Sequence, residues 1–477
     1  MNEKLTYENP LCTRYASSEM SYIFSQDKKF KTWRKFWFYL AQSEKELGIN
    51  ISDDQIKELE NNIENINYEI ANEQEKKVRH DVMAHIYAYG VQCPKAAGII
   101  HLGATSCYVG DNTDIVIMDE AIKLIKKKVL KAIFLLSKFA LKYKKLPTLA
   151  FTHFQPAQLT TVGKRATIWI QDLLIDLQNI EFRISNTALL GCKGAVGTQA
   201  SFLNLFEGDI KKVEKLEELI CKKAGYEKVV PISGQTYSRK IDYQVLSTLS
   251  GIAQTAHKFA NDIRLLQGIK EVEEPFEELQ VGSSAMPYKR NPMQCERICS
   301  LAKHVITNVQ NAAFISSTQW LERTLDDSAN RRISIPEAFL TSDAILNICI
   351  NVLTGISVNE NIIKKHINKE ISFLATENIL MNSVKSGGNR QKLHEKLRNY
   401  SMDNIKKIKN GKKNDLIEKI LIDPDFKISR EEINDMLLAE KFIGCAEFQV
   451  ESFIKNCIKP LLKNGKSLSD IFIDIRV

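Results

Sequence analysis

Five long segments in the middle of the chain repeat apolar residues at three- and four-residue steps, and this periodicity constrains the fold more than any other feature. They cover residues 114–143, 160–183, 240–267, 292–320 and 336–356. In the third, one face carries Ile241, Val245, Leu249, Ile252, Ala256, Ala260 and Ile263, which is helical spacing. A helix of about 28 residues is about 42 Å long. Rods of this length must bury their apolar faces against one another, so the sequence predicts an elongated all-α bundle. Several carry apolar residues on more than one side, which indicates further helices from other subunits.

Shorter elements are predicted on both sides of this bundle. Residues 1–110 mix helix and loop, and an apolar stripe there is assigned to core packing: Phe30, Trp33, Trp37 and Leu40. Residues 359–477 form shorter helices, with breaks at 386–389 and 423–425. We therefore expect three helical domains, at 1–110, 111–358 and 359–477. The chain lacks the alternation of strands and helices around a glycine-rich phosphate loop that a nucleotide-cofactor fold requires, and no cofactor is expected.

Composition narrows the class of protein and its compartment. With 44% hydrophobic and 26% charged residues, the chain has the make-up of a soluble globular protein. No apolar run approaches the ~20 residues that span a bilayer, and the polar N-terminus does not resemble a signal peptide. The ten cysteines form no CxxC pair, which favours a reduced, cytoplasmic chain without zinc. The net charge of +8 comes mostly from lysines on helix faces, so we expect no nucleic-acid partner and no membrane partner.

Residues 282–292, with the sequence GSSAMPYKRNP, form a polar loop between two predicted helices. Gly282 permits backbone angles closed to other residues, while Pro287 and Pro292 interrupt helices. The loop concentrates two hydroxyls, an ammonium, a guanidinium and an amide. These groups fit a segment that closes over an anionic substrate and delivers one reactive side chain, although most loops of this kind are only exposed connections.

A second polar segment, residues 152–158 (THFQPAQ), precedes the second long helix. Pro156 favours a non-helical path for the residues before it, which leaves the imidazole of His153 on a connection at one end of the bundle. Thr152 and the two glutamines are able to fix its tautomer. Histidine is the usual side chain for proton transfer near neutral pH, whereas a solitary histidine is more often structural.

Three further clusters are rich in groups that bind anions. Arg79-His80-Asp81 is predicted as an anion-binding corner, because the five-residue step from His80 to His85 is unlike a zinc pair and an arginine opposes a cation. Residues 103–106 (GATS) and 111–114 (DNTD) contain hydroxyls and carboxylates that would serve either as helix caps or as ligands. Residues 322–332 (ERTLDDSANRR) form either a surface salt-bridge network or a phosphate site, since the arginine fork binds phosphate in a bidentate manner.

Several of these segments resemble the motifs of one family. Residues 282–292 are similar to the GSSxMPxKxNP loop of the fumarase/aspartase superfamily, in the form found in adenylosuccinate lyases. Residues 152–158 resemble its THxQPAQ segment, and residues 322–332 resemble its ERTLDDSANRR segment. The resemblance runs from about Arg14 to His394 and is weaker beyond. One departure is Gln294-Cys295, where many animal members have Arg-Ser, and it bears only on contacts near the phosphate.

The resemblance implies an activity, roles for residues and an assembly. The activity is β-elimination of fumarate from adenylosuccinate, giving AMP, and from succinylated aminoimidazole carboxamide ribotide in purine nucleotide biosynthesis. His153 would protonate the leaving nitrogen, and Ser283, as an alkoxide, would remove the proton from carbon. The site would be shared between subunits of a homotetramer and would need no metal. The implied substrate-binding residues are Arg14, Tyr15, Arg79, His80, Asp81, Thr105, Ser106, Thr152, Gln235, Lys289, Asn291, Arg297, Arg323, Ser328 and Arg332.

Three alternatives remain beside this interpretation. The first is another fumarate-releasing lyase of the superfamily, such as argininosuccinate lyase or fumarase, against which the Tyr288-Lys289-Arg290 form of the loop argues. The second is a non-catalytic structural relative, which the presence of both His153 and Ser283 disfavours. The third is a basic bundle that binds nucleic acid, which predicts steeply salt-dependent binding.

Overall fold

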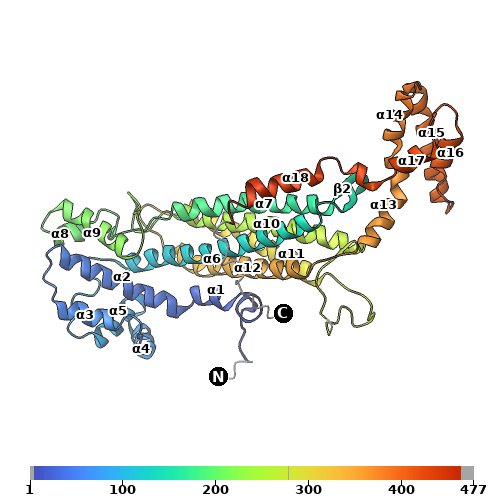
Figure 1. Ribbon diagram of the computed structural model, residues 1–477. Coiled ribbons are helices and arrows are strands. Elements are labelled where there is room, and N and C mark those ends of the chain that lie inside the picture. The colour runs from blue at the N-terminus through green and yellow to red at the C-terminus, as the bar shows by residue number, and fades with distance from the viewer. Residues whose placement is uncertain (1–4, 278, 463–477) are drawn as a thin grey trace.

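The computed structural model describes residues 5–277 and 279–462, and its centre is an elongated bundle of helices (Figure 1). Five long helices run along the bundle axis and pack against one another. They are α6 (Ser106–Lys142), α7 (Val162–Ser185), α10 (Lys240–Gly268), α11 (Met293–Ser317) and α12 (Asp326–Gly355). The all-α fold predicted from the periodicity is confirmed.

The predicted helix bounds hold at three of these helices and fail at two. For α7, α10 and α11 the predicted ends lie within three residues of the observed ones. Helix α6 begins at Ser106 rather than 114, so Asp111 and Asp114 lie inside it and are not helix caps. The domain boundary predicted at 110 therefore falls within the first turns of this helix. Helix α12 begins at Asp326, ten residues before Pro336, and continues through that proline.

One end of the bundle is covered by the N-terminal elements and by the segment after α7 (Figure 1). Helix α2 packs against α6 and α9, and its stripe of Phe30, Trp33, Trp37 and Leu40 is buried as predicted. The elements at this end are α2 (Gln26–Glu46), α3 (Asp53–Asn61), α4 (Tyr68–Val78), α5 (Asp81–Gln92), α8 (Ala200–Leu205) and α9 (Ile210–Lys223). The first two elements of the chain, η2 (Leu11–Tyr15) and α1 (Ser18–Ile23), lie along the side of the bundle against α12.

The opposite end carries the C-terminal helices and short antiparallel strand pairs (Figure 1). Helices α14 to α17 enclose a small apolar cluster of their own, while buried apolar residues of α13, α18 and η4 belong to the main core. The helical elements are α13 (Glu360–Leu374), α14 (Thr376–Lys385), α15 (Arg390–Lys409), α16 (Leu416–Ile422), α17 (Arg430–Met436), η3 (Ala439–Phe442), α18 (Ala446–Phe453) and η4 (Ile454–Ile458). The strands are β1 (Pro147–Thr152) with β2 (Gln155–Thr161), and β3 (Val272–Glu273) with β4 (Ser357–Val358).

A buried polar contact anchors the N-terminal segment to the bundle. The ammonium of Lys128 on α6 forms an ion pair with Asp343 on α12 and donates to Asn347 Oδ1 at 2.8 Å. Asp343 also accepts a hydrogen bond from the backbone N–H of Ser17 at 2.7 Å. Because Ser17 follows η2 by two residues, this contact holds Arg14 and Tyr15 beside α12.

Helix α12 also bears on the membrane prediction. It contains an 18-residue window that is apolar and long enough to cross a bilayer, which the sequence analysis did not anticipate. However, 83% of that window is buried inside the protein, as in the core helix of a bundle. Its apolar character is therefore explained by helix packing.

Candidate active site

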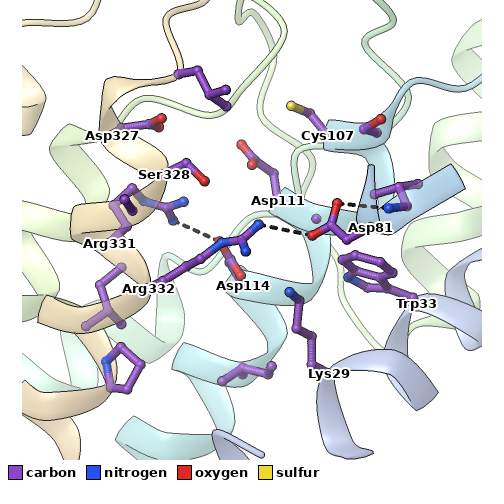
Figure 2. A pocket seen from close by; sticks show the side chains of 18 of the residues that line it. Lys29, Trp33, Asp81, Cys107, Asp111, Asp114, Asp327, Ser328, Arg331 and Arg332 are labelled. Carbon is purple, nitrogen blue, oxygen red and sulfur yellow. Dashed lines mark hydrogen bonds and ion pairs between the residues drawn. The ribbon is translucent and has the colours of Figure 1, made fainter. Parts of the chain in front are cut away.

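A cavity of ≈ 680 Å³ lies where the first turns of α5, α6 and α12 meet the side of α2 (Figure 2). It is lined by charged side chains of both signs together with a few apolar ones. Seven of the predicted binding residues line it: Arg79, His80, Asp81, Ser106, Arg323, Ser328 and Arg332. The sequence-distant clusters at 79–81, 106 and 323–332 thus form one site.

Helix termini position the first group of side chains. Arg79 ends α4 in the left-handed region (φ 55°), which turns the chain sharply into α5. His80 caps α5, since its Nδ1 accepts a hydrogen bond from the backbone N–H of Met83 at 3.4 Å. With Nδ1 as acceptor the proton lies on Nε2, which is 3.3 Å from Ser106 Oγ and donates to it. The cap therefore fixes both the tautomer and the direction of the His80 ring.

Asp81 and Arg332 form an ion pair across the cavity (Figure 2). Arg332 Nη2 is 3.0 Å from Asp81 Oδ2, and the other carboxylate oxygen accepts from the N–H of Val82 at 2.8 Å. Burial alone would raise the pKa of Asp81, but the charges of Lys29 and Arg332 outweigh it and hold that pKa below its usual range. Asp81 is thus ionised and keeps the guanidinium of Arg332 over the cavity.

A buried network of arginines and aspartates supports the cavity from beneath. Asp327 accepts from Arg323 Nη1 at 2.8 Å and from Arg239 Nε at 2.6 Å. Arg239 also forms a bidentate pair with Asp111 on α6, at 2.9 and 3.2 Å. Arg331 bridges Asp114, at 3.0 Å, and Asp242, at 2.7 Å. These pairs connect α6, α10 and α12, so the position of Arg323 depends on three helices.

Gln235 and Thr105 lie next to the cavity without lining it. The backbone N–H of Gln235 donates to the carbonyl of Glu322 at 3.0 Å, and its side-chain oxygen accepts from Cys107 Sγ at 3.3 Å. A side chain at Gly234 would approach the carbonyl of Glu322 to 2.6 Å, which requires glycine there. Thr105 is the N-cap residue of α6, although its side chain makes no capping hydrogen bond.

The loop of residues 282–292 is folded around its own serine. Ser283 Oγ accepts hydrogen bonds from the backbone N–H groups of Ala285, at 3.3 Å, and Met286, at 3.1 Å. Asn291 Nδ2 donates to the carbonyl of Gly282 at 2.7 Å and closes the loop. The side chain of Lys289 is exposed. Asn291, predicted to bind substrate, thus closes the loop through this hydrogen bond, whereas Ser283 accepts from two backbone N–H donors.

Three other predicted residues lie together near the start of α11. The guanidinium of Arg297, one turn into that helix, lies 6.0 Å from the centre of the Tyr15 ring. Tyr15 ends η2, which packs against α12. Arg14 precedes it in the same π-helical turn and is exposed. Arg14, Tyr15 and Arg297 therefore form a second group, apart from the cavity.

Thr152 and His153 lie in a β-hairpin that the sequence did not predict. Strand β1 pairs with β2, and Thr152 lies opposite Gln155, so His153 and Phe154 form a two-residue turn. Both turn residues have positive φ, 52° and 56°. Two-residue hairpin turns need such angles, but they normally take asparagine or glycine, and each unfavourable residue costs of order 1–3 kcal/mol. Strain of this kind at an exposed histidine is typical of a functional position.

These groups are separated within one chain by the length of the bundle. The hairpin follows the far end of α6, whose 37 residues span about 55 Å from Ser106 to Lys142. The 282–292 loop precedes α11, whose 25 residues span about 37 Å before the chain returns to Arg323. Neither His153 nor a residue of this loop is among the described residues that line the cavity.

Several cavity residues were not anticipated from the sequence. Lys29 and Trp33 belong to a helix assigned to core packing, and Arg239 was not singled out at all. Asp111, Asp327 and Arg331 lie in segments marked as polar clusters, but they were not named as site residues. His85 is not among the cavity residues: it stacks on Phe30 with ring centres 3.7 Å apart, and burial lowers its pKa to about 4. The alternation of acidic and basic residues in 322–332 was the available hint, because such alternation at four-residue spacing permits internal ion pairs.

Two family models match the chain. One, described as Lyase, matches residues 15–307, and a second, described as Adenylosuccinate lyase C-terminus, matches residues 372–453. Among curated proteins, the adenylosuccinate lyase of Schizosaccharomyces pombe is 50% identical and covers 98% of both chains. That of Saccharomyces cerevisiae is 51% identical over 96% of both. That of Schistosoma mansoni is 46% identical over 98% of both.

Solved structures share the fold at low sequence identity. The 3-carboxy-cis,cis-muconate lactonizing enzyme from Pseudomonas putida has a TM-score of 0.80 at 20% identity and covers 93% of this chain and 98% of its own. A fumarate lyase from Mesorhizobium sp. BNC1 has a TM-score of 0.80 at 18% identity, with coverage of 94% and 100%. Both support the all-α bundle.

Proposed function

The chain belongs to the adenylosuccinate lyase family, and from this premise we propose that it cleaves the C–N bond of adenylosuccinate to release fumarate and AMP. It is a C–N lyase. The observation that supports adenylosuccinate as the substrate is the identity of 46–51% to adenylosuccinate lyases over 96–98% of the chain. The same match disfavours argininosuccinate lyase. We extend the proposal to the succinylated aminoimidazole carboxamide ribotide, which carries the same succinyl and ribose phosphate groups.

Ser283 is the proposed base that removes the proton from the succinyl carbon. A free serine is a very poor base, so its alkoxide must be stabilised. The N–H groups of Ala285 and Met286 already point at Ser283 Oγ. A preorganised donor of this kind contributes about 3 kcal/mol toward an oxyanion. Lys289, exposed on the same loop, would hold the carboxylate on which charge builds, and Asn291 would join it only after releasing Gly282.

His153 is the proposed proton donor to the leaving nitrogen, and it must come from another copy of the chain. Within one chain the hairpin is separated from the cavity by the length of α6, about 55 Å. Positioned acid catalysis contributes about 10²–10⁴ in rate, which requires His153 within hydrogen-bond reach of the substrate. We therefore propose a homotetramer in which the cavity, the serine loop and the hairpin of each site belong to different subunits.

The cationic residues are proposed to hold the nucleotide. The cavity would bind one part of it through Arg323, Ser328 and Arg332, with Arg79, His80, Asp81, Thr105, Ser106 and Gln235 around them. Arg14, Tyr15 and Arg297 would approach from a second copy, and Thr152 from the hairpin. Bidentate arginines suit a phosphate, which a simple diacid lacks.

The activity and the shared site are tested together. The purified chain should convert adenylosuccinate to AMP and fumarate, and Ser283→Ala and His153→Ala should each lose at least about 10²-fold in kcat. When the two inactive variants are denatured and refolded as a mixture, about one quarter of the sites receive both native parts if the parts come from different chains. A mixture that stays inactive, although each variant refolds to the native size, would refute the shared site.

The state of the cysteines supports a proposal for the compartment. All ten are free, and six of them are buried. A chain with this many unpaired thiols is suited to a reducing environment, so we propose that it works in the cytoplasm. Fractionation of the source cells, with activity measured in each fraction, tests this.

A further inference from the structure

Lys29 projects from the first turn of α2 into the cavity (Figure 2). Its side chain is largely buried, and its ammonium lies 4.7 Å from the centre of the Trp33 ring and 5.1 Å from that of Phe30. The head of the side chain is directed toward the same space as Asp114 and Arg332 (Figure 2). Lys29 thus contributes a positive charge to the wall of the cavity that faces α12.

The other buried cations of the cavity are each neutralised by carboxylates. Arg323 pairs with Asp327 at 2.8 Å, and Arg331 pairs with Asp114 and Asp242. By contrast, across residues 5–277 and 279–462 no carboxylate lies within 4.0 Å of the Lys29 ammonium. Its neighbour Lys28, on the same helix, pairs with Glu120 at 2.6 Å and does not line the cavity.

An unpaired ammonium in this position needs an anion. Burial and the charge of Arg332 lower the pKa of Lys29, while Asp81, Asp114 and Glu75 act in the opposite direction without reaching ion-pair distance. The faces of Trp33 and Phe30 return only about 0.5–2 kcal/mol of the solvation that the ammonium loses. An anionic group brought into the cavity would restore the missing interaction, and the substrate carries phosphate and carboxylate groups.

We propose that Lys29 is a substrate-binding residue whose ammonium contacts an anionic group of the bound nucleotide. The inference rests on the proposed function, because it takes adenylosuccinate as the occupant of the cavity. The shared chemistry is an oxyanion, which belongs either to the ribose phosphate or to the succinyl group. AMP carries only the first and fumarate only the second, so the two products separate the sources.

The test compares Lys29→Met, which keeps the length of the side chain and removes its charge, with Lys29→Arg and with the matched control Lys28→Met. The full-length enzyme is assayed for kcat and KM with adenylosuccinate and for inhibition by AMP and by fumarate. Loss of one charged hydrogen bond predicts a rise of about 10- to 100-fold in KM for Lys29→Met with kcat nearly unchanged. Lys29→Arg should recover most of the affinity, and Lys28→Met should match the wild type.

The inhibition constants decide where the contact is made. A weaker AMP inhibition in Lys29→Met assigns the phosphate, and a weaker fumarate inhibition assigns the carboxylate. Unchanged values for KM and both inhibitors overturn the inference while leaving the proposed function intact. An equal rise of KM in Lys29→Met and Lys29→Arg, with a matching drop in thermal stability, would show that Lys29 has only a structural role. That result would also overturn the inference. If the wild type does not cleave adenylosuccinate, calorimetric binding of AMP to the same variants still tests Lys29 by itself.

Discussion

Replacing Asp327 by asparagine should show how much the buried ion-pair network beneath the cavity contributes to stability and to substrate binding. The carboxylate of Asp327 is fully buried and lies between two guanidiniums, 2.8 Å from Arg323 and 2.6 Å from Arg239. Burial alone would raise its pKa, but the attraction of Arg239 and Arg323 outweighs it and holds the pKa below its usual range. In Asp327→Asn one side of the amide presents N–H donors to an arginine, which is a repulsive arrangement.

The expected magnitude follows from this geometry. Removing one partner of a buried pair costs about 3–5 kcal/mol, because the opposite charge is left uncompensated. Arg239 keeps its bidentate contact with Asp111, at 2.9 and 3.2 Å, so we expect the lower end of that range. Since the folded pKa is depressed, the stabilisation is complete above the unfolded value of about 3.9 and is lost as the pH falls below it. The full effect is therefore present at neutral pH.

Two measurements on the purified variant test this expectation. The thermal midpoint should fall by several degrees, and KM for adenylosuccinate should rise about tenfold or more, because Arg323 loses the partner that orients it. Asp326→Asn is the matched control: Asp326 is the preceding residue, is exposed and contacts Thr324 at 3.1 Å. An Asp327→Asn enzyme with the stability and KM of the Asp326→Asn enzyme would refute the role assigned to the buried network.

Further predictions concern the loop and a buried acid. Ser283→Ala should abolish turnover with an unchanged thermal midpoint, whereas Ser284→Ala, at the exposed neighbouring residue, should retain most activity. Equal losses of kcat in the two variants would contradict the assignment. Gly282→Ala places a Cβ 2.2 Å from the carbonyl of Lys289, so kcat should drop at least tenfold without global unfolding, while Gly98→Ala, with open space around it, should be silent. Burial raises the pKa of Glu44 to about 9, so the folded state retains a proton that the unfolded state releases near pH 4.5. The free energy of unfolding of Glu44→Gln, measured with urea, should therefore equal that of the wild type below about pH 5. Between about pH 5 and pH 9 it should exceed the wild-type value by an amount that grows by up to about 1.4 kcal/mol per pH unit.

The helices were predictable where apolar spacing continued to their ends, and they were not where polar function interrupted it. The ends of α10 could be predicted from the residues of its apolar face. At α6 the first three turns carry Asp111, Asn112 and Asp114, which local reasoning assigns to caps. They are inside the helix because Asp111 and Asp114 pair with Arg239 and Arg331 from other helices, and a sequence does not display such partners.

The candidate site residues came from motifs, but their grouping in space could not be predicted from the sequence. His80 and Ser106 are 26 positions apart and touch through a 3.3 Å contact, which arises because the tertiary fold brings the N-terminal ends of α5 and α6 together. The hairpin was missed because His153 and Phe154 occupy angles that asparagine and glycine normally take, so no turn signal was present. Asn291 has a partner in Gly282 that its motif does not reveal.

The start of α12 shows how helical register divides a dense run of charges between a buried ion-pair network and a more exposed side. Asp327 and Arg331 are four residues apart, so they share one face of the helix and both enter the buried network. Ser328 and Arg332 each follow by one residue on the less buried side of the helix, with the Arg332 side chain 63% exposed, although all four residues line the cavity. Adjacent arginines of equal chemistry therefore differ in role because a step of one residue turns the helix by about 100°. A one-residue insertion between Asp327 and Ser328, with the rest of α12 in place, should rotate Asp327 by about 100° about the helix axis and move it away from Arg239.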